Sequence, residues 1–185
     1  MLRLVRDESD VQAGRCELRS VAKNAVEATE NEVRHHGSLT TKIPPGLWVP
    51  IRESSMFQLL VNLIHNAAQA HDEGSGRPNH IRVEASTVSR HGEQAVRLIV
   101  ADQGAGMSRE VRERIFDPFF TTKKIGHGTG LGLAVCRSII EGAGGTLDVT
   151  APGGAALAVP TRAFGLAPLV DHEALAPPTL PRSAP

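Results

Sequence analysis

Residues 102–134 decide how this chain folds. They read D-Q-G-A-G-M at Asp102–Met107, F-D-P-F-F-T-T-K-K at Phe116–Lys124 and G-H-G-T-G-L-G-L-A at Gly126–Ala134. An acidic residue begins a glycine turn, a polar basic segment follows, and a second glycine run opens an apolar helix. Upstream, the segment Asn62–Ala70 reads N-L-I-H-N-A-A-Q-A and places two amides one helical turn apart. Four elements in this order are far more specific than a single glycine motif.

The composition fits one ordinary domain with tails. The chain has 185 residues, with 20 Lys and Arg against 20 Asp and Glu, so its formal net charge is zero. We therefore expect no electrostatic binding of nucleic acid or of acidic membranes. The aromatic content of 3%, without any Tyr, also argues against base-stacking surfaces. No apolar run approaches the roughly 20 residues that cross a bilayer. We expect no membrane contact by this segment.

The cysteines and the N-terminus indicate a cytoplasmic location. Cys16 and Cys136 are far apart and lack metal-ligand spacing, as expected of inert thiols in a reducing cytosol. Residues 1–10 are charged and lack the apolar stretch of a signal peptide. A longer parent protein anchored to a membrane through other segments is compatible with these observations.

Hydrophobic periodicity predicts four helices and six strands. The helices are expected over residues 20–35, 54–72, 108–115 and 131–141, with Ser20 as the cap of the first and Gly37 as its end. The strands are expected over residues 39–43, 47–51, 80–88, 96–101, 146–150 and 155–159, the first two forming a hairpin around Pro44, Pro45 and Gly46. We expect an α/β (α+β) two-layer sandwich, in which about three helices cover one face of a mixed, mostly antiparallel sheet.

The four motifs together resemble the ATP-binding catalytic domain of bacterial sensor histidine kinases, in the ATPase group that includes DNA gyrase, Hsp90 and MutL. Asn62–Ala70 is similar to the N box, Asp102–Gly106 to the first glycine box, Phe116–Lys123 to the F box, and Gly126–Ala134 to the second glycine box. The residues of the F box and the second glycine box are most similar to those of nitrogen-regulator-type kinases. The resemblance covers roughly residues 15–160.

This resemblance implies a domain organisation. Residues 1–14 are expected to end a dimerisation-domain helix or to form a linker, and residues 15–163 to form the catalytic domain. Residues 164–185, rich in proline, read as a disordered tail.

The resemblance also implies how a nucleotide is held. The Asp102 carboxylate would accept a hydrogen bond from the exocyclic amine of adenine, which selects ATP over GTP, while Gly104 and Gly106 permit positive φ and close backbone approach. The side-chain oxygen of Asn66 would coordinate Mg²⁺ that bridges the phosphates. Asn62 stands where water-activating members carry a Glu general base. An amide cannot take up a proton at neutral pH, so we expect ATP to be preserved for transfer.

The second glycine box and the segment before it would hold the phosphates. Side chains at its alternating glycines would block the phosphates or the helix packing, and the N-terminus of the following helix favours anions. Lys123 and Lys124 would neutralise phosphate charge as catalytic residues, whereas His127 reads as a loop residue. The further nucleotide-binding candidates are Phe116, Thr122, Gly126, Gly128, Thr129, Gly130, Leu131 and Gly132.

Phe116, Phe119 and Phe120 are expected to pin a mobile lid to the domain body, with one of them exposed to a partner domain. Gln69 replaces a basic residue that some members of the group carry near the phosphates.

The acceptor histidine is not evident in this chain. His35 and His36 end a helix before Gly37, and His65 lies inside the N box, without the acidic residue that follows an acceptor. The implied reaction is transfer of the γ-phosphoryl group of ATP to a histidine of a dimerisation and phosphoacceptor domain. That domain would belong to the same homodimeric protein, and a response-regulator receiver domain would then take the phosphoryl group.

Two other functions stay open. One is a serine kinase of the anti-sigma type, against which the F box spelling argues. The other is a non-catalytic nucleotide-sensing or scaffold module, against which the retained Asn66, Asp102 and glycines argue.

Overall fold

The computed structural model describes residues 14–70, 78–90, 93–123, 128–149 and 154–160. Its elements, in chain order, are β1 (Cys16–Glu17), α2 (Leu18–His36), β2 (Gly37–Lys42), β3 (Trp48–Val49), α3 (Glu53–Gln69), β4 (Asn79–Arg90), β5 (Glu93–Ala101), α4 (Arg109–Arg114), α5 (Gly132–Gly142), β6 (Thr146–Val149) and β7 (Gly154–Pro160).

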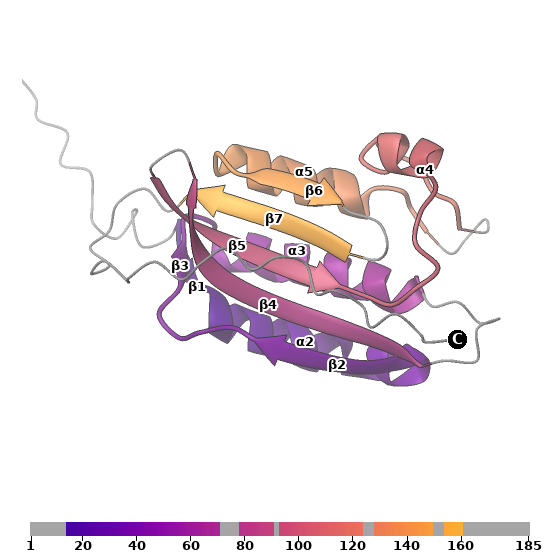
Figure 1. The fold of residues 1–185 in the computed structure, drawn as a ribbon, viewed down its shortest axis with the longest axis horizontal. Helices are drawn as coiled ribbons and strands as arrows, with labels where there is room; N and C mark the ends of the chain where they lie inside the picture. Colours follow the sequence, from indigo (N-terminus) through magenta and orange to yellow (C-terminus); the bar gives the residue numbers. More distant parts are fainter. Residues whose placement is uncertain (1–13, 71–77, 91–92, 124–127, 150–153, 161–185) are drawn as a thin grey trace, which may run out of the picture.

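The described strands form a five-stranded sheet in the order β2-β4-β5-β7-β6, with a separate short pair of β1 and β3. Strand β2 runs parallel to β4, and the other neighbours in the large sheet are antiparallel. Helices α2, α3 and α5 lie side by side behind this sheet (Figure 1). The expected two-layer sandwich with a mixed, mostly antiparallel sheet is therefore confirmed.

Helix α3 is central because apolar residues follow its length on the side that faces the sheet. Its buried residues are Met56, Leu59, Leu60, Leu63, Ile64, Ala67 and Ala68. Facing them, Ile81, Val83 and Ala85 of β4 alternate with exposed or half-buried residues, as a strand with one buried face requires. Burial of these side chains supplies most of the driving force for folding. Phe57 and Val61 are only partly buried and pack against this core.

Helix α2 begins earlier than predicted, and Ser20 is not its cap. Glu17 is the N-cap residue, and its carboxylate accepts a hydrogen bond from the Ser20 N–H at 2.7 Å. The other carboxylate oxygen accepts from the Gly46 N–H at 3.1 Å. A negative charge at a helix N-terminus is stabilised by the free N–H groups. Glu17 therefore starts the helix and also holds the distant Pro44–Gly46 turn.

The predicted hairpin around Pro44–Gly46 is wrong. Strand β2 instead pairs in parallel with β4, with Gly37 opposite Asn79. Strand β3 pairs with β1, Cys16 lying opposite Val49. Two extended segments that are neighbours in sequence can form their backbone hydrogen bonds with distant strands as well as with each other. The local pattern of apolar residues does not show which strand will be the partner.

Several sequence-based predictions lie outside the described residues. The predicted boundaries at residues 14 and 164 stay predictions, because residues 1–13 and 161–185 are not described. In the parts that are described, no helix combines the length and the apolar character that crossing a membrane requires.

Gly37 ends α2 and allows β2 to approach β4. A Cβ atom at Gly37 would lie 1.8 Å from the backbone oxygen of Asn79, so the two strands cannot keep their spacing with any side chain there. We expect Gly37→Ala to lower the free energy of unfolding by about 1–3 kcal/mol or more, as overpacking does. Urea unfolding followed by circular dichroism measures this loss.

Gly142→Ala is the matched control, because no atom lies within 4 Å of a Cβ at this position of α5. Alanine is also the better helix former, so stability should stay equal or rise by up to about 1 kcal/mol. Equal losses in the two variants would show that the close approach of Gly37 to Asn79 is not the cause.

Candidate functional site

A pocket of about 730 Å³ opens where the end of α3, the turn after β5, the segment after α4 and the start of α5 meet. It brings together residues that the sequence analysis assigned to a nucleotide site from separate motifs. Those that line it are Asn62, Asn66, Asp102, Gly106, Thr122, Lys123, Gly128, Thr129, Gly130 and Gly132. Gly104, Phe116 and Leu131 do not line it, and Lys124, Gly126 and His127 lie outside the described residues.

Asn62 and Asn66 stand one turn apart on α3 and both face the pocket. The Nδ2 group of Asn62 donates to the Gly132 carbonyl at 3.5 Å, which links α3 to the start of α5. The Oδ1 atom of Asn66 accepts from the Lys123 ammonium at 3.3 Å. The amide oxygen of Asn66 therefore already faces a cation.

Asp102 follows the last residue of β5 and is half-buried in the pocket. Burial raises the pKa of its carboxyl group, and a hydrogen bond from the Gly104 N–H at 2.9 Å offsets part of this rise. The carboxylate thus stands at a strand end with acceptor capacity left over. A ligand that donates an N–H group here would favour the ionised form.

The two glycines of the Asp102 turn have different roles. Gly106 has φ of 75°, which a residue with a side chain rarely adopts. Gly104 does not have the positive φ that we expected. A Cβ atom on Gly104 would lie 2.1 Å from the Ala70 carbonyl oxygen at the end of α3. Gly104 therefore lets the turn close onto α3.

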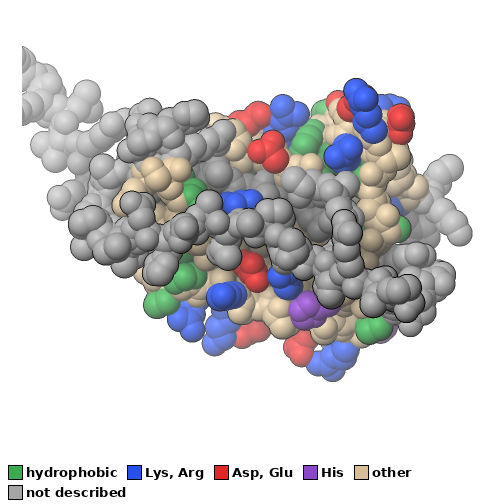
Figure 2. Space-filling model, viewed as in Figure 1, with side chains coloured by type: hydrophobic (Ala, Val, Ile, Leu, Met, Phe, Trp, Pro, Cys, Tyr) green, Lys and Arg blue, Asp and Glu red, His purple; other side chains and the backbone are tan. Residues whose placement is uncertain are grey.

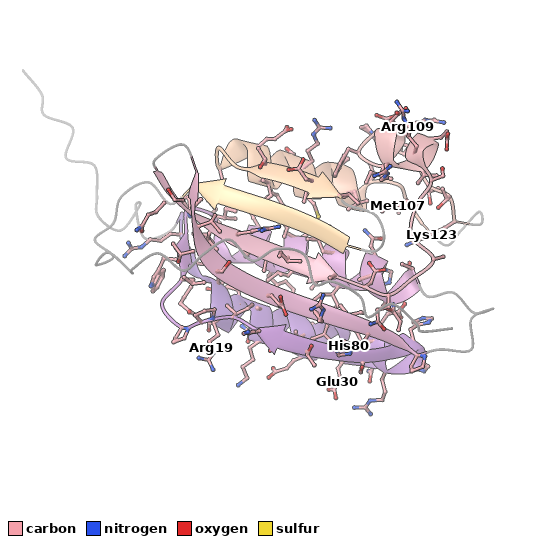
Figure 3. The ribbon with its side chains drawn as sticks, in the orientation of Figure 1. Arg19, Glu30, His80, Met107, Arg109 and Lys123 are labelled. Carbon is pink, nitrogen blue, oxygen red and sulfur yellow. The ribbon has the colours of Figure 1, made fainter. Side chains whose placement is uncertain are left out.

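Lys123 connects the segment after α4 to α3. Its ammonium donates to the Asn66 side chain and, by a short hydrogen bond, to the Gln69 side-chain oxygen. Burial lowers the pKa of Lys123, and the nearby Glu32 carboxylate offsets part of this shift. Gln69 is itself held through Nε2, which contacts the His65 ring at 2.8 Å and donates to Glu32 at 3.2 Å. Lys123 lies at the end of the molecule that carries α4 and Met107 (Figure 3).

The three phenylalanines differ in what they contact. Phe116 packs against the core and beneath the Arg137 guanidinium, whose carbon lies 5.2 Å from the ring centre. Phe120 lines the pocket under Arg114, at 4.4 Å. Phe119 is 75% exposed, which agrees with the expectation that one of the three phenylalanines is exposed. That it faces a partner domain stays a prediction.

Phe119 and Gly130 join the segment after α4 to the segment before α5 through their backbones. The Phe119 N–H donates to the Gly130 carbonyl at 3.0 Å. Both residues adopt the left-handed region, with φ of 68° and 67°. A Cβ atom on Gly130 would lie 2.4 Å from the carbonyl carbon of Phe119. Only glycine therefore fits at position 130 while this contact persists.

Thr129 makes a hydrogen bond just before the start of α5, and the glycines around it are not all tightly packed. The Thr129 hydroxyl accepts from the Leu131 N–H at 3.3 Å. At Gly132, an added Cβ would contact Asn62 at an ordinary 3.7 Å, so protein atoms alone do not require glycine there. The expectation was that a side chain here would block either the phosphates or the helix packing, and for Gly132 the phosphate alternative stays a prediction. Gly132 and Leu133, the first residues of α5, line the pocket, and the N-terminus of a helix favours anions.

Sequence reasoning missed an apolar wall of the pocket. Met107, Val111 and Ile115 line it together with the amides of α3. Val111 and Ile115 are spaced by one helical turn in and after the short, otherwise exposed α4, a signal that was present in the sequence. Charged side chains of both signs cover the outside of α4 (Figure 2). The pocket thus has an apolar side and a polar side, as a heterocyclic ligand with charged groups needs.

The described residues contain no cluster of three His, Cys, Asp or Glu side chains able to hold a metal ion. A cation would therefore be held by Asn66 together with oxygen atoms of a ligand. The residues fit this, because the Lys123 ammonium occupies such a position on Asn66 now.

Comparison with known proteins agrees with this geometry. Residues 51–161 match the family described as histidine kinase-, DNA gyrase B- and HSP90-like ATPases. A sensor histidine kinase, ZraS of Klebsiella oxytoca, is 42% identical over 122 residues, which are 65% of this chain and 24% of that protein. The chain thus spans about a quarter of that relative.

Two solved structures are similar in fold. The nucleotide-free catalytic domain of the histidine kinase ThkA superposes with a TM-score of 0.64 at 28% identity, over 79% of this chain and 93% of that one. Full-length ShkA in complex with AMPPNP gives a TM-score of 0.63 at 25% identity, over 83% of this chain and 32% of that one.

The buried Asp102 carboxylate should cost stability. Because its pKa is raised, the ionised form destabilises the folded state above that pKa, and the cost disappears as the pH falls through it. We expect Asp102→Asn to have a higher free energy of unfolding than the parent chain at neutral pH, with the difference shrinking in acid. Urea unfolding at several pH values measures it.

Asp148→Asn, at an exposed position of β6, changes the net charge equally and should alter stability by less than about 0.5 kcal/mol. A less stable Asp102→Asn protein at neutral pH would contradict the prediction.

Proposed function

Since the chain belongs to the family of histidine kinase-, DNA gyrase B- and HSP90-like ATPases, we propose that this pocket binds Mg²⁺–ATP and presents its γ-phosphoryl group to a histidine of a separate phosphoacceptor domain. The chain carries a catalytic domain of the sensor histidine kinase type. Because it spans only part of its relatives, the complete phosphotransfer reaction and its partners are part of the proposal.

The observation that carries the proposal is that a carboxylate and several groups that favour anions line the same pocket. The half-buried Asp102 lines the same pocket as Asn66, Lys123 and Gly132, the first residue of α5. An acid that accepts from an amine, and donors that face anions, match the base and the phosphates of one nucleotide. AMPPNP, an ATP analogue, is bound in the related ShkA structure, which supports the same ligand class here.

At the base end, Asp102 accepts from the adenine amine, and the apolar side chains of Met107 and Ile115 lie against the ring. Gly106 allows the turn its left-handed backbone. GTP presents a carbonyl where ATP presents an amine, so the Asp102 carboxylate would repel it. Gly104 acts indirectly by closing the turn onto α3.

At the phosphate end, Asn66 supplies an oxygen ligand for Mg²⁺, and Lys123 contacts the β- and γ-phosphates. Bound Mg²⁺ would neutralise phosphate charge. We propose the same phosphate role for Lys124, and nucleotide contacts for Asn62, Thr122, Gly126, Gly128, Thr129, Gly130 and Gly132. Phe116 and Leu131 do not line the pocket, so their nucleotide contacts stay predictions. Positioning and charge stabilisation, more than covalent chemistry by the protein, drive such a transfer.

The acceptor histidine belongs to a dimerisation domain in our proposal. His35 and His36 are the last residues of α2. His65 contacts Gln69 and Glu32. A receiver domain of a response regulator would then accept the phosphoryl group. We also place the reaction in the cytoplasm, where ATP is supplied and where the buried thiols of Cys16 and Cys136 stay reduced.

Nucleotide affinity should separate the two ends of the site. We expect Asp102→Asn to weaken ATP binding about 10- to 100-fold, the worth of a hydrogen bond to a charged group. Asn66→Ala should remove most of the gain in affinity that Mg²⁺ gives. Titration of a fluorescent ATP analogue, with and without Mg²⁺, measures both.

Asn24→Ala is the matched control, because Asn24 is an exposed helical asparagine of α2. Its affinity should equal that of the parent chain. If all three variants bind Mg²⁺–ATP as the parent does, the proposed site is wrong.

Transfer should require an added acceptor domain. We expect the chain to hydrolyse γ-labelled ATP slowly, because Asn62 cannot act as a general base. When a dimerisation domain is supplied separately, the chain should label that domain with acid-labile phosphohistidine. Lys123→Met should slow the transfer about 10²-fold by removing a phosphate-facing charge. Lys23→Met, which removes an exposed lysine of α2, should not slow it.

Rapid steady hydrolysis by the chain alone would contradict the role of Asn62. Acid-stable label would indicate a serine kinase, and ATP binding without any transfer would indicate a nucleotide-sensing module.

A further inference from the structure

Asn79 is a buried polar residue that lies outside the pocket. In the described part of the chain, only Thr29 and Asn79 are polar residues with buried side chains, and Asn79 is 2% exposed. It is the first residue of β4 and lies opposite Gly37 of β2. A buried amide is costly unless its donor and its acceptor both find partners.

Both ends of the Asn79 amide are used, and they reach different elements. The Nδ2 group donates to the Ala67 carbonyl of α3 at 2.8 Å. The Oδ1 atom accepts from the Gln103 N–H at 2.9 Å. Ala67 directly follows Asn66, and Gln103 directly follows Asp102. One side chain therefore joins the two backbone positions next to Asn66 and Asp102, two residues that line the pocket.

The two backbone partners have few alternatives. Ala67 lies in the last turn of α3, where, among the described residues, its carbonyl otherwise accepts only a longer hydrogen bond from the Ala70 N–H, at 3.3 Å. Gln103 lies between β5 and α4, outside regular structure. A backbone hydrogen bond from the Ala105 N–H to the Ala70 carbonyl, at 3.0 Å, also joins these two segments. That bond needs no side chain, so Asn79 is the side chain that can be changed.

We propose that Asn79 is a positioning residue of the nucleotide site, which fixes the Asp102 carboxylate relative to Asn66 so that one nucleotide satisfies both. This inference rests on the proposed function, because it assumes that Asp102 reads the adenine amine. Asn79 does not line the pocket and does not touch the ligand. It acts by holding the first residue of the turn against α3.

The proposal requires an amide of this length. Leucine has the same shape but neither donor nor acceptor, and aspartate keeps the acceptor for Gln103 but loses the donor to Ala67. In either variant the link from the Asp102 turn through residue 79 to α3 is broken, and the backbone hydrogen bond from Ala105 to Ala70 remains. The carboxylate then samples positions from which it meets the amine less well, while Asn66 and the phosphate end are unchanged.

A positioning role and a purely structural role of Asn79 differ in their effect on the preference between two nucleotides, not in their effect on total affinity. ATP and purine riboside triphosphate differ only in the exocyclic amine. A purely structural role for Asn79 would lower stability and would weaken both nucleotides alike. A positioning role lowers the ratio of their affinities, because only ATP uses the carboxylate that has moved.

The experiment measures the dissociation constants of both triphosphates with Mg²⁺ on the 185-residue chain. We expect Asn79→Leu to reduce the preference for ATP about tenfold, the size of one hydrogen bond made poorly. Asn79→Asp should reduce it in the same direction and serves if the leucine variant does not fold. Circular dichroism at the assay temperature confirms that each variant is folded.

Two controls separate the possible failures. Thr29→Val removes the other buried polar group, whose hydroxyl donates to Ala25 within α2 at 2.8 Å, and should leave the ratio unchanged. Asp102→Ala, which removes the acceptor, should abolish the preference; if it does not, the proposed reading of adenine is wrong. If Asp102→Ala abolishes the preference while folded Asn79 variants retain it, the proposed function stands and the positioning role of Asn79 is overturned.

Discussion

Closure of the Asp102 turn onto the C-terminal end of α3 is the contact on which the site depends. The Ala105 N–H donates to the Ala70 carbonyl, and the approach is so close that a Cβ atom on Gly104 would lie 2.1 Å from that oxygen. This contact fixes an acid at the end of a strand against a helix that carries two amides. The remaining walls of the pocket come from α4, from the segment after it and from the start of α5.

The charges in the pocket are arranged at a cost to the empty protein. Burial raises the pKa of Asp102 and lowers that of Lys123, so it disfavours the charged form of both groups. Lys123 recovers part of this cost by donating to Asn66 and Gln69. A ligand that brings an N–H donor to the acid and anionic oxygens to the lysine would relieve both penalties. Functional sites commonly give up stability in this way.

Much of the fold was predictable because its signals are local. The apolar spacing along α3 and the alternation in β4 depend only on helix and strand geometry, and both elements were predicted within a few residues. The errors concern partners. Nothing near Pro44–Gly46 indicates that β2 pairs with β4 or that β3 pairs with β1, and nothing near Ser20 indicates that Glu17 serves two distant N–H groups. Lys124 and Gly126 lie outside the described residues, so their expected positions stay predictions.

By itself the sequence determined which chemical groups the site contains and on which elements they stand, because the order of residues fixes the acid, the amides, the lysines and the glycine turns. Only the tertiary structure decided that Asn79 joins Gln103 to Ala67, that Lys123 contacts Asn66, and that Met107 and Val111 form the apolar wall. These contacts join segments distant in the chain. Their free energies depend on burial and on the distance between partners, which arise only when α3 packs against the sheet.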